Sequence, residues 1–181
     1  SLNLAMDFAD EDQTLLGYST LNLLNAHADP SFLRVALYQH VARQYFPAPR
    51  TNFVRVVING ESWGIYTNAQ QFNSEMVREW FATTRGTRWK VQGSPLGRGG
   101  LKYLGDDPNA YRNIYRIRTR DRAEAWTDLI KLTRVLSQTP LDRLEAEVAP
   151  LLDIDGVLKW LAVEKALMNS DGYWVRMSDC N

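Results

Sequence analysis

The sequence predicts an α+β protein, because extended segments fill its first part and helical periodicity fills its last part. Large apolar residues alternate with small or polar ones over residues 1–8, and this period of two indicates a half-buried strand. Asn59-Gly60 separates Phe53–Ile58 from Trp63–Thr67, two runs rich in β-branched and aromatic residues. Because Asn and Gly both tolerate positive φ, this arrangement predicts a β-hairpin.

A second short strand is predicted over residues 21–24, and a helix is predicted to begin soon after it at Asp29-Pro30. Asp caps helix N–H groups, and Pro at the first helical position loses no hydrogen bond. Pro47 is expected to stop this helix. The predicted apolar face of the helix is Leu33, Ala36, Leu37, Val41 and Tyr45.

The middle of the chain gives weaker signals. Ser74 is predicted to cap a short helix that follows the hairpin. Residues 85–120 are the least regular part, because several glycines and the turn Gly105–Pro108 interrupt them. Tyr111–Thr119 alternates only loosely, so it is compatible with a strand or with a helix.

Three helices are predicted in the last third of the chain. The first carries Trp126 and ends near Pro140, the second covers residues 141–148, and Asp155 is predicted to cap the third. The third helix is expected to end in the polar turn Asn169–Gly172. The residues expected along one side of it are Leu158, Leu161, Ala162, Lys165 and Met168.

The composition excludes several classes of protein. The 181 residues include 21 Lys plus Arg and 21 Asp plus Glu, and this balance argues against a chain that binds nucleic acid or anionic membranes over its whole length. Cys180 is the single cysteine, so no disulfide can form within the chain. No apolar run approaches the roughly 18 residues of a membrane span, and no signal peptide is visible. The ends at Ser1 and Asn181 lead us to expect a piece of a longer protein.

Basic residues are concentrated in one segment of the chain. Between residues 85 and 122 only three acids, Asp106, Asp107 and Asp121, accompany ten cations. Arginine-rich surfaces attract phosphate, but a solvated face with acidic partners elsewhere in the fold is the alternative interpretation. The cations are Arg85, Arg88, Lys90, Arg98, Lys102, Arg112, Arg116, Arg118, Arg120 and Arg122.

Two motifs fail when their spacing is tested. His27 and His40 lack nearby cysteines, so no zinc spacing is present, and a structural role is favoured for His40. The glycine-rich run GSPLGRGG, residues 93–100, resembles a phosphate cradle but lacks the Lys-Ser/Thr of a P-loop. A flexible loop is the better interpretation of that run.

One acidic segment could carry chemistry. Residues 169–174, NSDGYW, place an Asp at a turn after a helix, and SDCN follows shortly. Phosphoryl transfer needs one carboxylate to orient the nucleophile and further carboxylate or amide oxygens to bind Mg²⁺. A solvated Asn-Ser-Asp-Gly turn remains the alternative.

Four stretches of the sequence resemble the spore-coat protein H (CotH) kinase family. They are LNLLNAHADPSFLR, PAPRTNFVRVVINGESWGIYTNAQQFN, GGLKYLGDDPNAY and ALMNSDGYWVRMSDCN, which cover residues 21–34, 47–73, 99–111 and 166–181. The second stretch is the most specific, because it holds the pattern N-G-E-x-W-G-x-Y. Their order and spacing extend the resemblance over nearly the whole chain.

The resemblance implies an atypical protein-kinase-like fold for a single domain over residues 1–181. Residues 1–120 would form a strand-rich, nucleotide-lobe-like part with a hairpin and a helix, and residues 121–181 would begin a helical lobe. Active family members use ATP and Mg²⁺ to phosphorylate Ser in secreted or coat proteins. The resemblance therefore implies a nucleotide, a Ser-rich coat or surface protein as partners, and an extracellular or spore-surface location.

The resemblance also implies site residues. Asp171 matches the catalytic Asp of the family, and Asn181 stands where the family often carries a metal-binding Asn, although Cys180 replaces the usual aromatic residue before it. Arg34 and Tyr66 are candidate nucleotide contacts from family position alone. A salt bridge is the structural alternative for Arg34, and a core position is the alternative for Tyr66.

Two departures from the family pattern affect the expected activity. Gln70 stands among the candidate cofactor-binding residues at a position where many members have Glu, and an amide there would weaken an ion pair with a nucleotide-positioning Lys. A P-x-D metal-binding segment that follows in the family is missing after Asn181. We therefore expect these 181 residues to have little or no kinase activity by themselves, and the full-length parent to be the enzyme.

Two other functions remain open. The first is a non-catalytic coat-assembly or surface-binding protein on the same fold, which the Gln70 departure favours. The second is a binder of phosphate or polysaccharide that uses the basic segment. Neither alternative requires the acidic turn.

Overall fold

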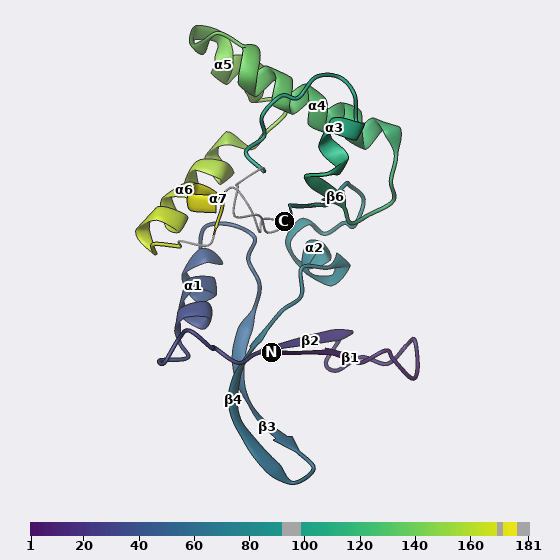
Figure 1. The fold of residues 1–181 in the computed structure, drawn as a ribbon, viewed down its shortest axis with the longest axis vertical. Helices are drawn as coiled ribbons and strands as arrows, with labels where there is room; N and C mark the ends of the chain where they lie inside the picture. The colour runs from purple at the N-terminus through teal and green to yellow at the C-terminus, as the bar shows by residue number, and fades with distance from the viewer. Residues whose placement is uncertain (92–98, 170–171, 177–181) are drawn as a thin grey trace. The chain divides into compact units, whose positions relative to one another are not determined.

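The computed structural model describes residues 1–91, 99–169 and 172–176 (Figure 1). These residues belong to two compact units, Ser1–Thr84 and Arg85–Asn181. A two-stranded sheet formed within residues 85–120 shares a core with the following helix and so belongs to the second unit. The division into lobes near residue 120 stays a prediction.

The first unit is built on a four-stranded antiparallel sheet with strand order β1-β2-β4-β3. The sheet confirms the two predicted N-terminal strands and the predicted hairpin. Two helices accompany it, one before and one after the hairpin in the chain. The elements are β1 (Leu2–Ala5), β2 (Thr20–Leu24), α1 (Arg34–Ala42), β3 (Thr51–Ile58), β4 (Glu61–Ala69) and α2 (Ser74–Phe81).

The β3–β4 hairpin turns at the two residues that the sequence indicates. Asn59 has φ 52° and Gly60 has φ 85°, so both adopt the left-handed conformation of the tight turn. The register shifts between Val56 and Val57, and Gly64 opposite Val56 also has a positive φ of 90°. This bulge bends the hairpin at the glycine, where the backbone conformation is least costly.

Helix α1 begins at Arg34 rather than at the predicted Pro30. Phe32 has φ 60°, which interrupts the helical backbone between the proline and the helix. Asp29 still serves the helix start, because its Oδ2 accepts a hydrogen bond of 2.8 Å from the backbone N of Arg34. The predicted apolar face is wrong in part, since the Leu37 side chain is 58% exposed.

Helix α2 is capped by Asn73 and not by Ser74. The Oδ1 atom of Asn73 accepts hydrogen bonds from the backbone N atoms of Glu75 at 3.1 Å and Met76 at 3.2 Å. Asn73 has extended backbone angles that suit this role, whereas Ser74 is already helical.

The second unit combines a two-stranded sheet with a helical remainder. Its core is an aromatic and aliphatic cluster that includes Tyr111, Tyr115 and Trp126, and the rings of Trp89 and Trp126 meet edge to face at 4.7 Å. Residues 111–119, which the sequence leaves compatible with a strand or a helix, contain the end of a short helix and then a strand. The elements are β5 (Trp89–Val91), α3 (Asn109–Arg112), β6 (Tyr115–Ile117), α4 (Ala123–Gln138), α5 (Leu141–Val148), α6 (Ile154–Ala166) and α7 (Tyr173–Arg176).

Helix α6 confirms the third predicted C-terminal helix but corrects its cap. Asp153, not Asp155, caps it by accepting a hydrogen bond of 3.0 Å from the backbone N of Gly156. Asp155 lies in the first turn and pairs with Lys159 at 2.6 Å. The side expected from periodicity is mostly exposed, with Leu158 at 60% and Met168 at 85%, and the buried residues of the helix are instead Val163 and Glu164.

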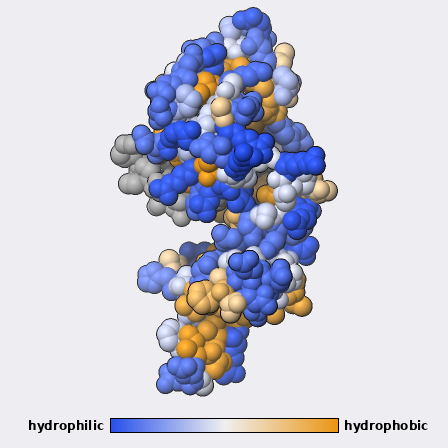
Figure 2. Space-filling model, turned by 90° about the vertical axis from the view of Figure 1, so that its right-hand side faces the viewer, coloured by the Kyte–Doolittle hydropathy of each residue, from blue (hydrophilic) through white to orange (hydrophobic). Residues whose placement is uncertain are grey.

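Exposed apolar side chains gather on the β3–β4 hairpin, where Figure 2 shows hydrophobic surface at the lower end of the view. They include Phe53, Val57, Trp63 and Ile65. Among the helices that the structure describes, none is long and apolar enough to cross a membrane.

The hairpin turn gives a test of the local fold. Gly60 has φ 85°, and a side chain in this conformation costs about 1–2 kcal/mol. We expect Gly60→Ala to lower the free energy of unfolding by about this amount in urea titrations. Ser62→Ala in the extended strand is the matched control, and an equal loss in both variants would contradict the role of the turn.

Candidate functional site

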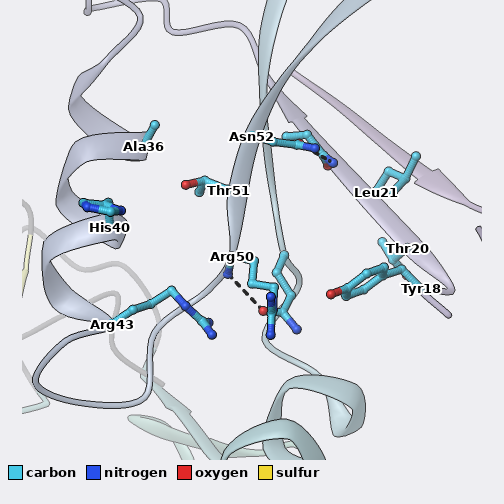
Figure 3. A pocket seen from close by; sticks show the side chains of 11 residues that line it. Tyr18, Thr20, Leu21, Ala36, His40, Arg43, Arg50, Thr51 and Asn52 are labelled. Atoms are coloured by element: carbon cyan, nitrogen blue, oxygen red, sulfur yellow. Dashed lines mark hydrogen bonds between the residues drawn. The ribbon is translucent and has the colours of Figure 1, made fainter. Parts of the chain in front are cut away.

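A pocket of about 540 Å³ lies within the first unit, between α1 and the sheet (Figure 3). Helix α1, the start of β3, the end of β4 and the β2 region all contribute side chains to it. Most of the lining residues have polar side chains, and none has a carboxylate. The lining residues are Tyr18, Thr20, Leu21, Ala36, His40, Arg43, Arg50, Thr51, Asn52, Asn68 and Gln70.

One face of α1 forms a wall of this pocket. Ala36 and His40 lie one helical turn apart, and Arg43 follows at the C-terminal cap of the helix. Residues spaced by three and four positions share a helix face, so all three side chains reach the same space. Figure 3 shows them along the side of the helix that faces the sheet.

The arginines of the pocket are held by a carboxylate behind its lining. Glu79 of α2 accepts hydrogen bonds through Oε1 from Nη2 of Arg43 at 2.7 Å and from Nε of Arg50 at 2.8 Å. Glu79 Oε2 accepts a third bond of 3.1 Å from Nε2 of Gln70. Gln70 Oε1 in turn accepts the backbone N–H of Arg50 at 3.0 Å, so the amide uses both of its ends.

This hydrogen-bond network determines the charge state of Glu79. Burial by itself would raise the pKa of Glu79, but hydrogen bonds from Arg43, Gln70 and Arg50 outweigh it and hold that pKa below its ordinary value. The Glu79 side chain is 23% exposed and therefore remains ionised while largely shielded from water. Because two guanidinium groups share one carboxylate, the network leaves a net positive charge beside the pocket.

Arg43 is fixed by further contacts. Its Nη1 donates a hydrogen bond of 2.5 Å to the carbonyl oxygen of Ala48, and its guanidinium lies 4.7 Å from the centroid of the Trp80 ring. The indole N–H of Trp80 donates to the same carbonyl at 3.3 Å. The guanidinium therefore has little freedom to move, which favours a preorganised charge.

The strands contribute neutral hydrogen-bonding groups. Asn52 and Asn68 lie opposite each other in the register, and Nδ2 of Asn68 donates to Oδ1 of Asn52 at 3.0 Å. Thr51 and Thr20 add hydroxyl groups. A positive end, neutral amides and hydroxyls suit a ligand that has both an anionic part and a polar uncharged part.

Residues 1–179 match the protein family described as CotH kinase protein. The chain belongs to the CotH kinase family. This membership confirms the family that the sequence resembles. A search of curated proteins finds no match to the chain.

The three candidate nucleotide contacts implied by CotH resemblance lie in different places. Gln70 lines the pocket, whereas Arg34 and Tyr66 do not belong to its lining. Arg34 is 73% exposed and forms an ion pair of 3.6 Å with Asp29, which agrees with its structural alternative. Tyr66 is half-buried on the same strand face as Asn68, two residues along β4. A nucleotide contact for either residue stays a prediction.

The catalytic candidate Asp171 and the metal candidate Asn181 lie outside the described residues. The residues that flank Asp171 are tied to α6. Asn169 donates through Nδ2 to Oε1 of Glu164 at 2.9 Å, and Glu164 is only 3% exposed. The ring of Tyr173 packs against Trp160 with centroids 5.3 Å apart.

Gly172 lies directly against this buried carboxylate. A Cβ atom on Gly172 would lie 2.0 Å from Oε2 of Glu164 and 2.9 Å from Nδ2 of Asn169. A side chain at position 172 would therefore require the Glu164 carboxylate and the Asn169 amide to move, whereas glycine does not.

A Mg²⁺ site is not assembled by the part of the chain that the structure describes, where no three His, Cys, Asp or Glu residues converge on a common point. The pocket lining offers only neutral oxygen atoms besides its cations. These residues therefore fit the anionic part of a ligand and do not fit a hard divalent cation.

Sequence reasoning missed most of the pocket. His40, Arg43 and Arg50 were not among the candidate cofactor-binding residues, although the spacing of Ala36, His40 and Arg43 on one helix face was visible. Arg50 also lies in the most specific of the CotH-like stretches. No local signal pairs Arg50 with Glu79, because 29 residues separate them along the chain.

The Glu79 network predicts a specific pH dependence. Its pKa is lowered in the folded state, so its stabilisation is present above the ordinary Glu pKa of about 4.3 and is lost as the pH falls through the lower folded-state value. We expect Glu79→Gln to reduce the free energy of unfolding at neutral pH by about 1–2 kcal/mol. In this variant the free energy of unfolding should also fall less steeply as the pH is lowered from about 5 to about 3.

Urea unfolding at a series of pH values measures both effects. Glu61→Gln at the exposed start of β4 removes the same charge and is the control. If the free energy of unfolding changes with pH equally in both variants, Glu79 is not the carboxylate that stabilises the first unit through its ionised form.

Proposed function

We propose that the protein is a CotH-like protein kinase that transfers phosphate from ATP to Ser of secreted or coat proteins, with the full-length parent as the active form. The observation that carries this proposal is the family match over residues 1–179. The cationic, carboxylate-free pocket of the first unit supports it, because a nucleotide needs such an environment for its phosphates.

The pocket is proposed as the nucleotide-binding site. Its volume of about 540 Å³ suits a small-molecule ligand. Arg43 and Arg50 would attract the phosphates, and the amides of Asn52 and Asn68 would donate to or accept from the sugar or base. The network through Glu79 holds both guanidinium groups before a ligand arrives, which lowers the cost of ordering them on binding.

Asp171 is proposed as the carboxylate that orients the substrate Ser and takes its hydroxyl proton as the serine oxygen bonds to the transferred phosphorus and ADP leaves. Asn181 is proposed as a metal-binding residue. Bound Mg²⁺ would neutralise charge on the phosphoryl group. Both assignments rest on the resemblance of residues 166–181 to the family.

A second function is a non-catalytic coat-assembly or surface-binding protein on the same fold. The observation that favours it is the position of Gln70, whose amide is engaged by Arg50 and Glu79. A glutamate at this position would bring a second carboxylate against Glu79. The local network is therefore built around an amide and does not hold a free acid for a nucleotide-positioning lysine.

Partners and location follow the same family argument. We propose a Ser-rich protein substrate and placement on a spore or cell surface. CotH family membership supports the association with a spore coat.

The nucleotide site is tested by charge removal. We expect Arg50→Gln to weaken ATP binding at least about tenfold by titration calorimetry, since it removes one charge-assisted contact worth roughly 1.4 kcal/mol or more. Arg34→Gln is the matched control, because it lies outside the pocket and carries the same charge. A larger loss in Arg34→Gln would place the nucleotide at the family position instead. Urea unfolding without nucleotide shows whether either variant remains folded.

The catalytic role is tested in the full-length parent. Asp171→Asn is expected to reduce phosphate transfer to a Ser-rich protein by about a hundredfold or more, because it removes the proton acceptor. Nucleotide binding, measured as a rise in melting temperature with ATP and Mg²⁺, should persist. Unchanged transfer would refute the assignment, and no thermal shift in either protein at millimolar nucleotide would favour the non-catalytic function.

A further inference from the structure

The β5–β6 ribbon has one apolar face and one basic face. The register places Trp89 opposite Ile117 and Val91 opposite Tyr115. Trp89, Val91 and Tyr115 all contribute to the core of the second unit. Because alternate residues of a strand point to opposite faces, the residues between them point away from this core.

Four cations occupy that second face. Lys90 lies directly opposite Arg116 in the register. The ladder continues by one hydrogen bond of 2.8 Å from the backbone N of Arg118 to the carbonyl oxygen of Arg88, so these two residues also face each other. We call Arg88, Lys90, Arg116 and Arg118 the basic ribbon face.

This arrangement is electrostatically unfavourable for the isolated chain. Like charges directly opposite each other in an antiparallel pair are destabilising. Burial lowers the pKa of Arg88, and the charge of Arg118 lowers it further. The Nε atom of Arg88 is buried and has no hydrogen-bond partner. Within the described ranges, no carboxylate forms an ion pair with any residue of the basic ribbon face.

Two other arginines of the same unit are compensated by acidic and aromatic partners. Arg112 pairs with Asp121 at 2.6 Å, and its guanidinium lies 4.4 Å from the centroid of the Trp126 ring. Arg134 pairs with Asp106 and lies over the ring of Tyr103. Arg112 and Arg134 therefore each have an acidic and an aromatic partner, whereas none of the described residues forms an ion pair or a cation–π contact with the basic ribbon face.

We propose that the basic ribbon face binds an extended acidic segment of a partner protein. Alternate side chains of an extended segment are about 6.6–6.8 Å apart, which is also the spacing of successive same-face rungs of the ribbon. Acids at alternate positions of the segment would each meet one cationic pair, Arg88 with Arg118 or Lys90 with Arg116. This binding would be independent of the phosphoryl transfer proposed for the chain.

The residues around the basic ribbon face favour a protein segment over a nucleic acid as its ligand. Binding of single strands uses aromatic rings on which bases stack, together with a long basic groove. The rings of Trp89 and Tyr115 lie on the apolar face with the core, so they are unavailable to bases.

The test measures binding of a short synthetic peptide of alternating Glu and Thr to the 181-residue chain by titration calorimetry at low salt. We expect the double variant R116Q/R118Q to bind the peptide at least tenfold more weakly. R120Q/R122Q removes the same charge from exposed positions outside the strands and should bind within about twofold of the parent chain. A peptide of alternating Lys and Thr should not bind.

Two further measurements distinguish the alternatives. We expect Arg118→Gln to raise the melting temperature of the free chain, because it relieves the repulsion on Arg88. A fall in the melting temperature would show that Arg118 supports the fold, and would overturn the proposal. Equal peptide binding by both double variants, or tighter binding of a single-stranded oligothymidylate than of the acidic peptide, would also overturn it.

Discussion

The first unit depends on a single carboxylate. Glu79 of α2 receives Arg43 from the end of α1, Arg50 from the start of β3 and Gln70 from the residue after β4. Four separate parts of the chain therefore meet at one charged group. Removing the Glu79 carboxylate would leave two guanidinium groups close together without a shared anion. The shape of the pocket and the packing of α2 therefore both depend on this carboxylate.

Local signals account for much of the fold. Asn59-Gly60 predicts the hairpin because both residues have the positive φ that its turn requires. The start of α6 is harder to predict, because Asp153 and Asp155 can each cap a helix. Only the observed backbone identifies Asp153 as the cap. The start of α1 is not predictable from composition, because Phe32 adopts a left-handed conformation that its residue type disfavours.

The candidate site is less visible in the sequence than the fold. The family pattern makes Gln70 a candidate cofactor-binding residue, but it does not predict the contacts of Gln70 with Arg50 and Glu79, because folding brings these three residues together from separate segments. A count of arginines likewise cannot separate Arg112, which pairs with an acid, from Arg118, which faces another cation. The role of each arginine depends on which residues the fold places next to it, and the number of arginines in a segment does not reveal that role.

The close approach of Gly172 to α6 limits how this part of the protein can diverge during evolution. Even alanine at this position would place its Cβ atom 2.0 Å from the carboxylate of Glu164, a residue that is only 3% exposed, so that side chain would have to move. At Gly105, by comparison, a Cβ atom would meet nothing within 4 Å, and the cost of a side chain comes from the positive φ of 95°. A residue larger than glycine at 172 is therefore accommodated only where the side chain at 164 moves or is shorter, so the two positions constrain each other.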